Sequence, residues 1–275
     1  MNHHFLRFQF LVLSVLFVFT SCSTKTNAPT NPNLIYSVYQ PNKTDVVVNR
    51  DSYQKKLEGF WLATCIANWT GLVTEMDKIG NIGEIKTGPF YTRNDWGKPD
   101  RPSIWGQGLP SNLSPTIDFI YKDEGDIWGS DDDTDIEYMY QYMLYINQTS
   151  ILTAEQIRDG WLEHIEPDEE NYLWVSNQKA YDLMKNGMLP PETSNPNNNE
   201  HFEMIDAQLT TEIFGLFSPT RPDIALKIAH LPIRTTAQKN AAWISEFYIV
   251  MHSLATSVDT SFSMKQKVIW LANEA

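Results

Sequence analysis

Four carboxylates occur within five positions in the run Asp131-Asp132-Asp133-Thr134-Asp135. Negative charge at the amino terminus of a helix is favourable by roughly 0.3–1 kcal/mol per group, which accounts for one or two of these acids. Three consecutive carboxylates repel one another, and the repulsion grows with burial. A divalent cation removes this penalty, because hard cations such as Mg²⁺ and Ca²⁺ prefer carboxylate, hydroxyl and water oxygens. The first three aspartates need not be helical, so they can converge on one ion.

Two other interpretations of the run are a calcium loop of the EF-hand type and a solvated acidic cap. An EF-hand would require glycine and glutamate where the sequence has Ile136 and Tyr142, so that interpretation fails. The residues after the run are rich in tyrosine, methionine and leucine, which is typical of a buried helix. A buried helix with this start favours a metal site, and the acidic cap remains the alternative.

Apolar residues at helical spacing predict the elements that must position these acids. Thr153 and Gln156 form a capping-box pattern at the start of one predicted helix. Gly59 and Gly71 lie inside another and suggest close packing or close approach to a ligand. No alternating run marks a sheet, so the expected fold class is all-α. The predicted helices span residues 52–77, 131–147, 153–165, 168–186, 201–216, 221–230, 236–258 and 263–275.

Residues 80–129 have little periodicity, and they contain five prolines. A structureless stretch of this length is uncommon inside a compact domain and is often functional. We expect a long irregular loop region over the domain surface, with one or two short helices around residues 115–121. Its aromatic residues can either stack on a ligand or fill the interior of the loop; they include Phe90, Tyr91, Trp96 and Trp105.

The amino terminus predicts export. Arg7 precedes an apolar stretch over residues 8–19, which fits the core of a signal peptide. The following Cys22 stands in a sequence that resembles the bacterial lipobox, although an ordinary secretory signal is the alternative. We therefore expect a lipoprotein signal peptide over residues 1–22, with Cys22 lipidated, and a polar tether over residues 23–51. The expected location is the bacterial cell envelope, where the protein is held on the membrane through its lipid anchor.

The net charge of the 275-residue chain is −13. This charge argues against a nucleic-acid-binding protein, which needs a basic surface to displace counterions. It does not exclude a small anionic ligand that is held through bound cations. Once Cys22 is lipidated, Cys65 is the only remaining thiol, so no intrachain disulfide is expected.

The aspartate run, taken with Ser130 before it, resembles the signature of the ADP-ribosylglycohydrolase family. In that signature a hydroxyl or acidic residue precedes Asp-Asp-Thr at the start of an interior helix. A second motif agrees, since the helix that contains Gly59 and Gly71 is followed by Glu75. A third similar stretch runs over residues 205–222. The resemblance covers about residues 52–260 and implies an orthogonal multi-helix bundle.

By this resemblance, the metal ligands are Asp131, Asp132 and Asp133, and the metal is Mg²⁺. A complete domain of the family would hold two such ions. Glu75 is then the general acid or base, or holds the water, and its alternative role is an ordinary helix carboxylate in an ion pair. The family completes its site with a second cluster of Asp-x-Asp type, and none follows Asp206 here. We therefore expect residues 52–275 to form a domain that is incomplete at its carboxyl terminus.

The implied activity is hydrolysis of an N- or O-glycosidic bond at the ribose of an ADP-ribosyl group, so the expected partner is an ADP-ribosyl-type or other small-molecule substrate. Two alternatives remain open. One is a non-catalytic, lipid-anchored binding protein on the same fold, and the other is a glycosidase for exported nutrient sugars or nucleosides. Four histidines have no metal-ligand spacing and are expected to be structural: His164, His201, His230 and His252.

Overall fold

The computed structural model describes residues 40–78, 80–104, 111–129, 131–167 and 171–275, all within the unit Tyr36–Ala275. Cys22, the signal peptide and most of the tether lie outside the described residues. None of the helices in the described part is long and apolar enough to cross a membrane. The α-helices are α1 (Arg50–Val73), α2 (Asp132–Ile146), α3 (Ala154–His164), α4 (Val175–Lys185), α5 (Asp206–Thr210), α6 (Ile213–Leu216), α7 (Pro222–Thr236), α8 (Lys239–Leu254) and α9 (Met264–Glu274).

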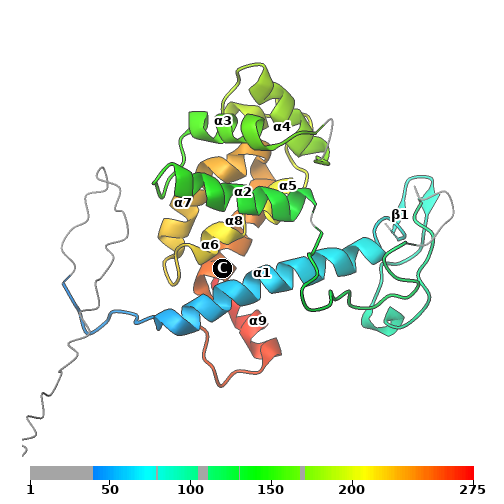
Figure 1. Ribbon diagram of the computed structural model, residues 1–275, viewed down its shortest axis with the longest axis horizontal. Coiled ribbons are helices and arrows are strands. Elements are labelled where there is room, and N and C mark those ends of the chain that lie inside the picture. The colour runs from blue at the N-terminus through cyan, green and yellow to red at the C-terminus, as the bar shows by residue number, and fades with distance from the viewer. Residues whose placement is uncertain (1–39, 79, 105–110, 130, 168–170) are drawn as a thin grey trace, which may run out of the picture. The chain divides into compact units, whose positions relative to one another are not determined.

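The core is built by α2 to α8, and the protein is mostly helical, which confirms the all-α class (Figure 1). Apolar residues four and seven positions apart on α2 face inward, as Ile136, Tyr140 and Met143 are all buried. The indole Nε1 of Trp161 on α3 donates to the Tyr140 hydroxyl at 3.2 Å. This bond satisfies two polar groups inside an apolar core, where an unpaired donor would be costly.

The helix α1 lies beside this bundle, and only Val73 of its residues is buried. Phe60 and Trp61 pack against the core, and the Tyr53 hydroxyl donates to the Leu216 carbonyl. A Cβ added at Gly59 would meet nothing within 4 Å, so close packing does not explain this glycine. The helix ends at Val73, four residues before the predicted end, so Glu75 lies just beyond it.

Further predicted helix boundaries are wrong. The predicted helix 201–216 is interrupted between α5 and α6, where the Thr211 hydroxyl donates back to the Ala207 carbonyl at 2.6 Å. The predicted helix 168–186 begins only at Val175, and α7 continues through Pro232 to Thr236. The capping box of Thr153 and Gln156 at the start of α3 is confirmed.

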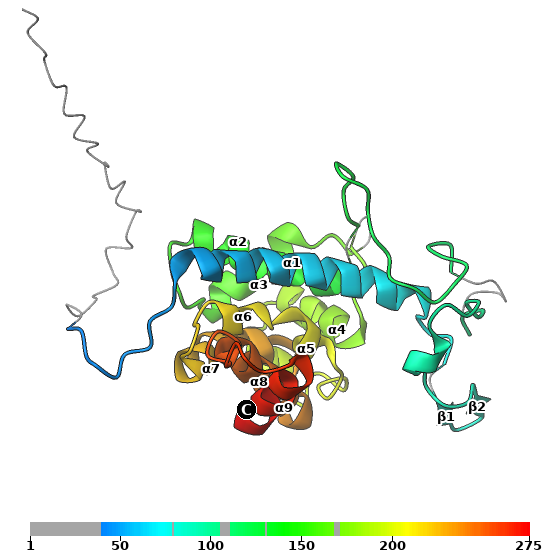
Figure 2. The same cartoon turned by 90° about the horizontal axis from the view of Figure 1, so that it is seen from below.

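The region between α1 and α2 contains little regular structure. The short helix predicted around residues 115–121 is absent; a bridge pairs Pro99 with Thr116 instead. Two strands, β1 (Asn81–Ile82) and β2 (Ile85–Lys86), pair antiparallel, and a 3₁₀ turn, η1, spans Arg93–Asp95. The region joins the end of α1 through backbone bonds such as Ile104 N to Met76 O at 3.0 Å (Figure 2). A second 3₁₀ turn, η2, spans Glu192–Ser194 after α4.

Candidate functional site

The carboxylates of Asp131, Asp132 and Asp133 converge at the start of α2. Each offers an oxygen that lies within 4.8 Å of the oxygens of the other two, and all three residues are half-buried. Asp131 is the N-cap, with an extended backbone at φ −135° and ψ −169°, and Asp132 is the first helical residue. This change from extended to helical backbone brings side chains together that would diverge on a regular helix.

Neighbouring elements hold two of the three aspartates in place. The amide of Asn68 on α1 donates to Asp131 Oδ2 at 2.5 Å. Asp132 Oδ2 accepts from the Trp174 backbone at 3.0 Å and from the Asn177 amide at 3.3 Å, both at the start of α4. The site is therefore fixed by α1 and α4 as well as by its own helix.

Several buried oxygens at this site accept no hydrogen bond within the described part of the chain, and two of them, Asp131 Oδ1 and Asn68 Oδ1, lie where α1 meets the aspartate run. They belong to side chains that are bonded to each other through their remaining polar atoms. Buried acceptors without donors are costly, and a bound cation satisfies such atoms. The donor set consists of carboxylate and amide oxygens, which suits a hard cation such as Mg²⁺. The residues present therefore fit the metal that the sequence predicts.

Three further acids lie around the aspartates, and the sequence analysis did not assign any of them to the site. Asp206 at the start of α5 is 2% exposed and accepts from the Asn177 backbone at 3.1 Å. Glu137 on α2 is fully buried and accepts from the Ile213 backbone at 2.9 Å. Glu212 is the residue before α6 and lines the same cleft as Asp131 and Asp133. Asp206 and Glu212 are far from the aspartate run along the chain, so no local pattern connects them to it, whereas Glu137 lies two residues after the run on the same helix.

The acids raise the pKa values of one another. Burial, followed by the charges of Asp131, Asp132, Asp206 and Glu212, raises the pKa of Asp133 to about 8. Burial also raises the pKa of Glu212 to about 7. No lysine or arginine in the described part is among the causes acting on either group. The site is thus an acidic cluster without an internal counter-charge, and it favours either protons or cations.

These residues border a cleft of about 670 Å³ between α1, α8 and the acidic cluster. The α1 residues that line it recur every three or four positions, which places them on one face of that helix. The lining consists of Phe60, Ala63, Thr64, Ala67, Asn68, Gly71, Leu72, Glu75, Asp131, Asp133, Leu209, Glu212, Tyr248, Met251, His252, Ala255 and Leu271. Gly71 therefore lies where close approach to a ligand is possible.

Glu75 stands at the edge of this cleft. Partial burial, followed by the charge of Asp131, raises the pKa of its carboxyl. None of the ion pairs between described residues includes Glu75, so the structure gives no support to the ion-pair alternative. A carboxyl with a raised pKa beside a candidate metal site is suited to proton transfer.

The aromatic residues of the irregular region that the structure describes do not line the cleft. The Trp96 ring stacks on Phe119 with centroids 4.6 Å apart, and the Tyr91 hydroxyl donates to Asp77 at 2.9 Å. Trp105 lies outside the described residues. The cleft instead takes its aromatic lining from Phe60, Tyr248 and His252, none of which was predicted to be functional.

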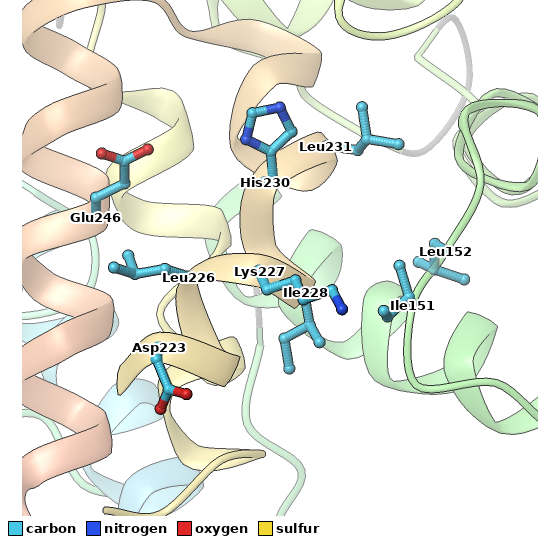
Figure 3. A pocket seen from close by; sticks show the side chains of 9 residues that line it. All are labelled: Ile151, Leu152, Asp223, Leu226, Lys227, Ile228, His230, Leu231 and Glu246. Atoms are coloured by element: carbon cyan, nitrogen blue, oxygen red, sulfur yellow. The ribbon is translucent and has the colours of Figure 1, made fainter. Parts of the chain in front are cut away.

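A second cavity, of about 580 Å³, lies between α7, α8 and the segment around Ile151 and Leu152 (Figure 3). Its two carboxylates are already paired within the chain. Asp223 accepts from Arg221 at 2.7 Å, and Glu246 accepts from Arg234 at 2.8 Å. This cavity therefore lacks the unneutralised charge that distinguishes the cleft at the aspartate run.

Comparison with family models, with curated proteins and with solved structures finds no match for this chain. The resemblance to the ADP-ribosylglycohydrolase family accordingly remains a prediction from the motifs.

Proposed function

We propose that this protein is a Mg²⁺-dependent hydrolase of N- or O-glycosidic bonds, of the ADP-ribosyl type or related, on a bundle of the ADP-ribosylglycohydrolase type. The observation that carries the proposal is the convergence of Asp131, Asp132 and Asp133 beside two buried oxygens that lack donors. An acidic cleft with room for a small molecule supports a site that acts on a sugar rather than a purely structural metal.

In this proposal Asp131, Asp132 and Asp133 hold the cation. When bound, the metal polarises the scissile bond and lowers the pKa of a water molecule. The hydrogen bonds from Asn68, Trp174 and Asn177 keep the aspartates in place, so that the ligands need little rearrangement on binding.

Glu75 would accept a proton from the attacking water or give one to the leaving group. Burial and the charge of Asp131 raise the pKa of this carboxyl, which favours a role in proton transfer. The hydrolysis adds water across the glycosidic bond, so the sugar gains a hydroxyl and the leaving group gains a proton.

Export and membrane attachment through Cys22 belong to the same proposal, and they rest on the amino-terminal sequence alone. A hydrolase placed there would meet substrates outside the cytoplasm. Membrane-fraction analysis of the parent chain and of Cys22→Ser tests this part independently of the active site.

One observation favours a non-catalytic binding protein as the second candidate. The resemblance predicts a second acidic cluster after Asp206, and the segment around Asp259 is the nearest to that pattern in the sequence. Asp259 is exposed, and its carboxylate accepts a hydrogen bond from the Ser261 hydroxyl at 2.7 Å. It does not line the cleft. If a second cluster is needed for turnover, the site would bind metal and ligand without cleaving the ligand.

Calorimetric titration of Mg²⁺ into the full-length chain tests the metal site. We expect binding by the parent and at least about tenfold weaker binding by Asp133→Asn. The matched control is Asp135→Asn, which removes an exposed carboxylate from the same turn of α2. Equal Mg²⁺ affinity in the parent and in Asp133→Asn would show that the site is wrongly assigned.

A further inference from the structure

The cleft has two chemically different ends. Phe60 and Asn68 lie on the same face of α1, eight residues apart, which is roughly 12 Å along the helix at about 1.5 Å per residue. At the first end the Phe60 ring packs edge-on against His252, with centroids 5.6 Å apart. At the second end the Asn68 amide donates a hydrogen bond to Asp131. Glu75, seven residues after Asn68 in the chain, lines the cleft as well.

The first end is apolar and uncharged. Burial lowers the pKa of His252 to about 4, so its imidazole is neutral at physiological pH. Tyr248, Met251 and Leu271 complete the wall near it. Aromatic and thioether side chains of this kind bind flat apolar groups.

No lysine or arginine lines the cleft in the part of the chain that the structure describes. The internal segments that it does not describe, at 79, 105–110, 130 and 168–170, contain no lysine or arginine in their sequence either. Lys56 is exposed and does not line the cleft, although its Nζ donates to the carbonyl of the lining residue Ala255 at 3.3 Å. Glu75, Asp131, Asp133 and Glu212 give the lining a strongly negative potential instead.

This charge distribution bears on the choice of substrate. A diphosphate group carries two negative charges and is usually bound by arginine, lysine or a helix amino terminus. A divalent cation at the aspartates would mainly offset the surrounding carboxylates, because the four that line the cleft exceed the two positive charges of one ion. A ligand that combines an uncharged sugar with a flat apolar group avoids the repulsion and matches both ends.

We propose that the cleft takes an uncharged glycoside with a flat apolar aglycone, such as a nucleoside, rather than a ligand that carries a diphosphate. The sugar hydroxyls lie at the acidic end beside Asp131 and Asp133, and the aglycone lies against the apolar wall that Phe60, Tyr248 and His252 form. This inference rests on the proposed function, and it narrows the substrate class of the same site.

Calorimetry on the full-length chain in detergent, with Mg²⁺ at saturation, tests the inference with two probes that share adenine and ribose. Adenosine is expected to bind at least about tenfold more tightly than ADP-ribose. Equal or tighter binding of ADP-ribose overturns the inference, as does binding of neither probe while Mg²⁺ binds. Failure of Mg²⁺ itself to bind overturns the proposed function instead, so the two failures are distinguishable.

A third probe tests the apolar end. Methyl β-ribofuranoside keeps the sugar hydroxyls and lacks the aglycone, so it is expected to bind at least about tenfold more weakly than adenosine. Equal affinities for methyl β-ribofuranoside and adenosine would show that the aglycone contributes nothing to binding, which would contradict the proposal.

A charge variant tests the reason for the preference. Thr64→Lys places a positive charge on the cleft face of α1, between the two ends. It should shift the ratio of ADP-ribose to adenosine affinity toward ADP-ribose by at least about tenfold. Leu62→Lys adds the same charge at an exposed position of the same helix outside the lining, and it should leave the ratio unchanged. An unchanged ratio in Thr64→Lys would contradict the electrostatic argument.

Discussion

The amide nitrogen of Asn68 donates a hydrogen bond to Asp131 Oδ2, and Asp131 Oδ1 and the amide oxygen of Asn68 are each buried without a donor. This pair connects the middle of α1 to the residue that starts α2. The arrangement is costly in the free protein, because each of these two buried acceptors lacks the donor or cation that would satisfy it. The metal site is therefore expected to contribute to how firmly α1 attaches to the bundle.

Replacement of Asp133 by asparagine should stabilise the protein when no metal is present. Burial and four neighbouring carboxylates disfavour the charged form of this group, so a neutral side chain removes repulsion. We expect a higher melting temperature in EDTA and a smaller increase on addition of Mg²⁺. Asp135→Asn should leave the increase on addition of Mg²⁺ unchanged. A lower melting temperature of Asp133→Asn in EDTA would contradict the electrostatic account.

The stability of the metal-free protein should fall as the pH rises from about 4 to about 8. The unfolded-state pKa values of Asp and Glu are about 4, whereas the folded-state values of Asp133 and Glu212 are about 8 and about 7. The folded state therefore binds more protons across this window, and each group lowers the free energy of unfolding by at most about 1.4 kcal/mol per pH unit. Melting curves in EDTA across the window check this, and Mg²⁺ should flatten the dependence. Stability that rises with pH in EDTA would contradict the pKa assignments.

Glu75→Gln should abolish hydrolysis and preserve Mg²⁺ binding. General acid–base catalysis contributes typically 10²–10⁴-fold, so a loss of about that size in turnover is expected. The measurement compares turnover of the glycosidic substrate with calorimetric Mg²⁺ affinity in the same preparation. Glu58→Gln, which removes an exposed carboxylate bonded to Gln54 on α1, is the matched control. Full turnover in Glu75→Gln would exclude Glu75 as the proton-transfer group.

Two glycine-to-alanine changes should have opposite effects on stability. A Cβ at Gly59 meets nothing within 4 Å, so alanine should stabilise the helix by about 0.5–1 kcal/mol. A Cβ at Gly215 would lie 2.4 Å from the Ile249 backbone oxygen, which cannot move aside easily. Gly215→Ala should therefore destabilise the protein by about 1–3 kcal/mol or more. Chemical denaturation of both variants measures the difference, and equal effects would contradict the packing of α6 on α8.

The sequence predicted the features that depend on local pattern. The core helix α2 was predicted within one residue at each end, because its apolar spacing and its acidic start are both local signals. The capping box at Thr153 was predicted for the same reason. The convergence of Asp131, Asp132 and Asp133 required only that the first of them lie outside the helix.

The remaining parts depend on contacts between distant segments. The break between α5 and α6 arises because Ile213 donates to Glu137, which lies 76 positions earlier in the chain. Asp206 is connected to the site through Asn177, whose backbone donates to Asp206 and whose side-chain amide donates to Asp132. No periodicity in the sequence carries such information, so the acids contributed by α5 and α6 were not assigned to the site.

The contact between Trp69 and Gly129 has a consequence for which substitutions the protein can tolerate. The indole donates to the Gly129 carbonyl at 2.6 Å, and a Cβ at Gly129 would lie 2.4 Å from the indole ring. Any side chain at this position must displace the segment that leads into Asp131. Gly129→Ala should therefore lose Mg²⁺ affinity although every proposed ligand is intact. A residue that touches no ligand would then be as intolerant of replacement as the aspartates themselves.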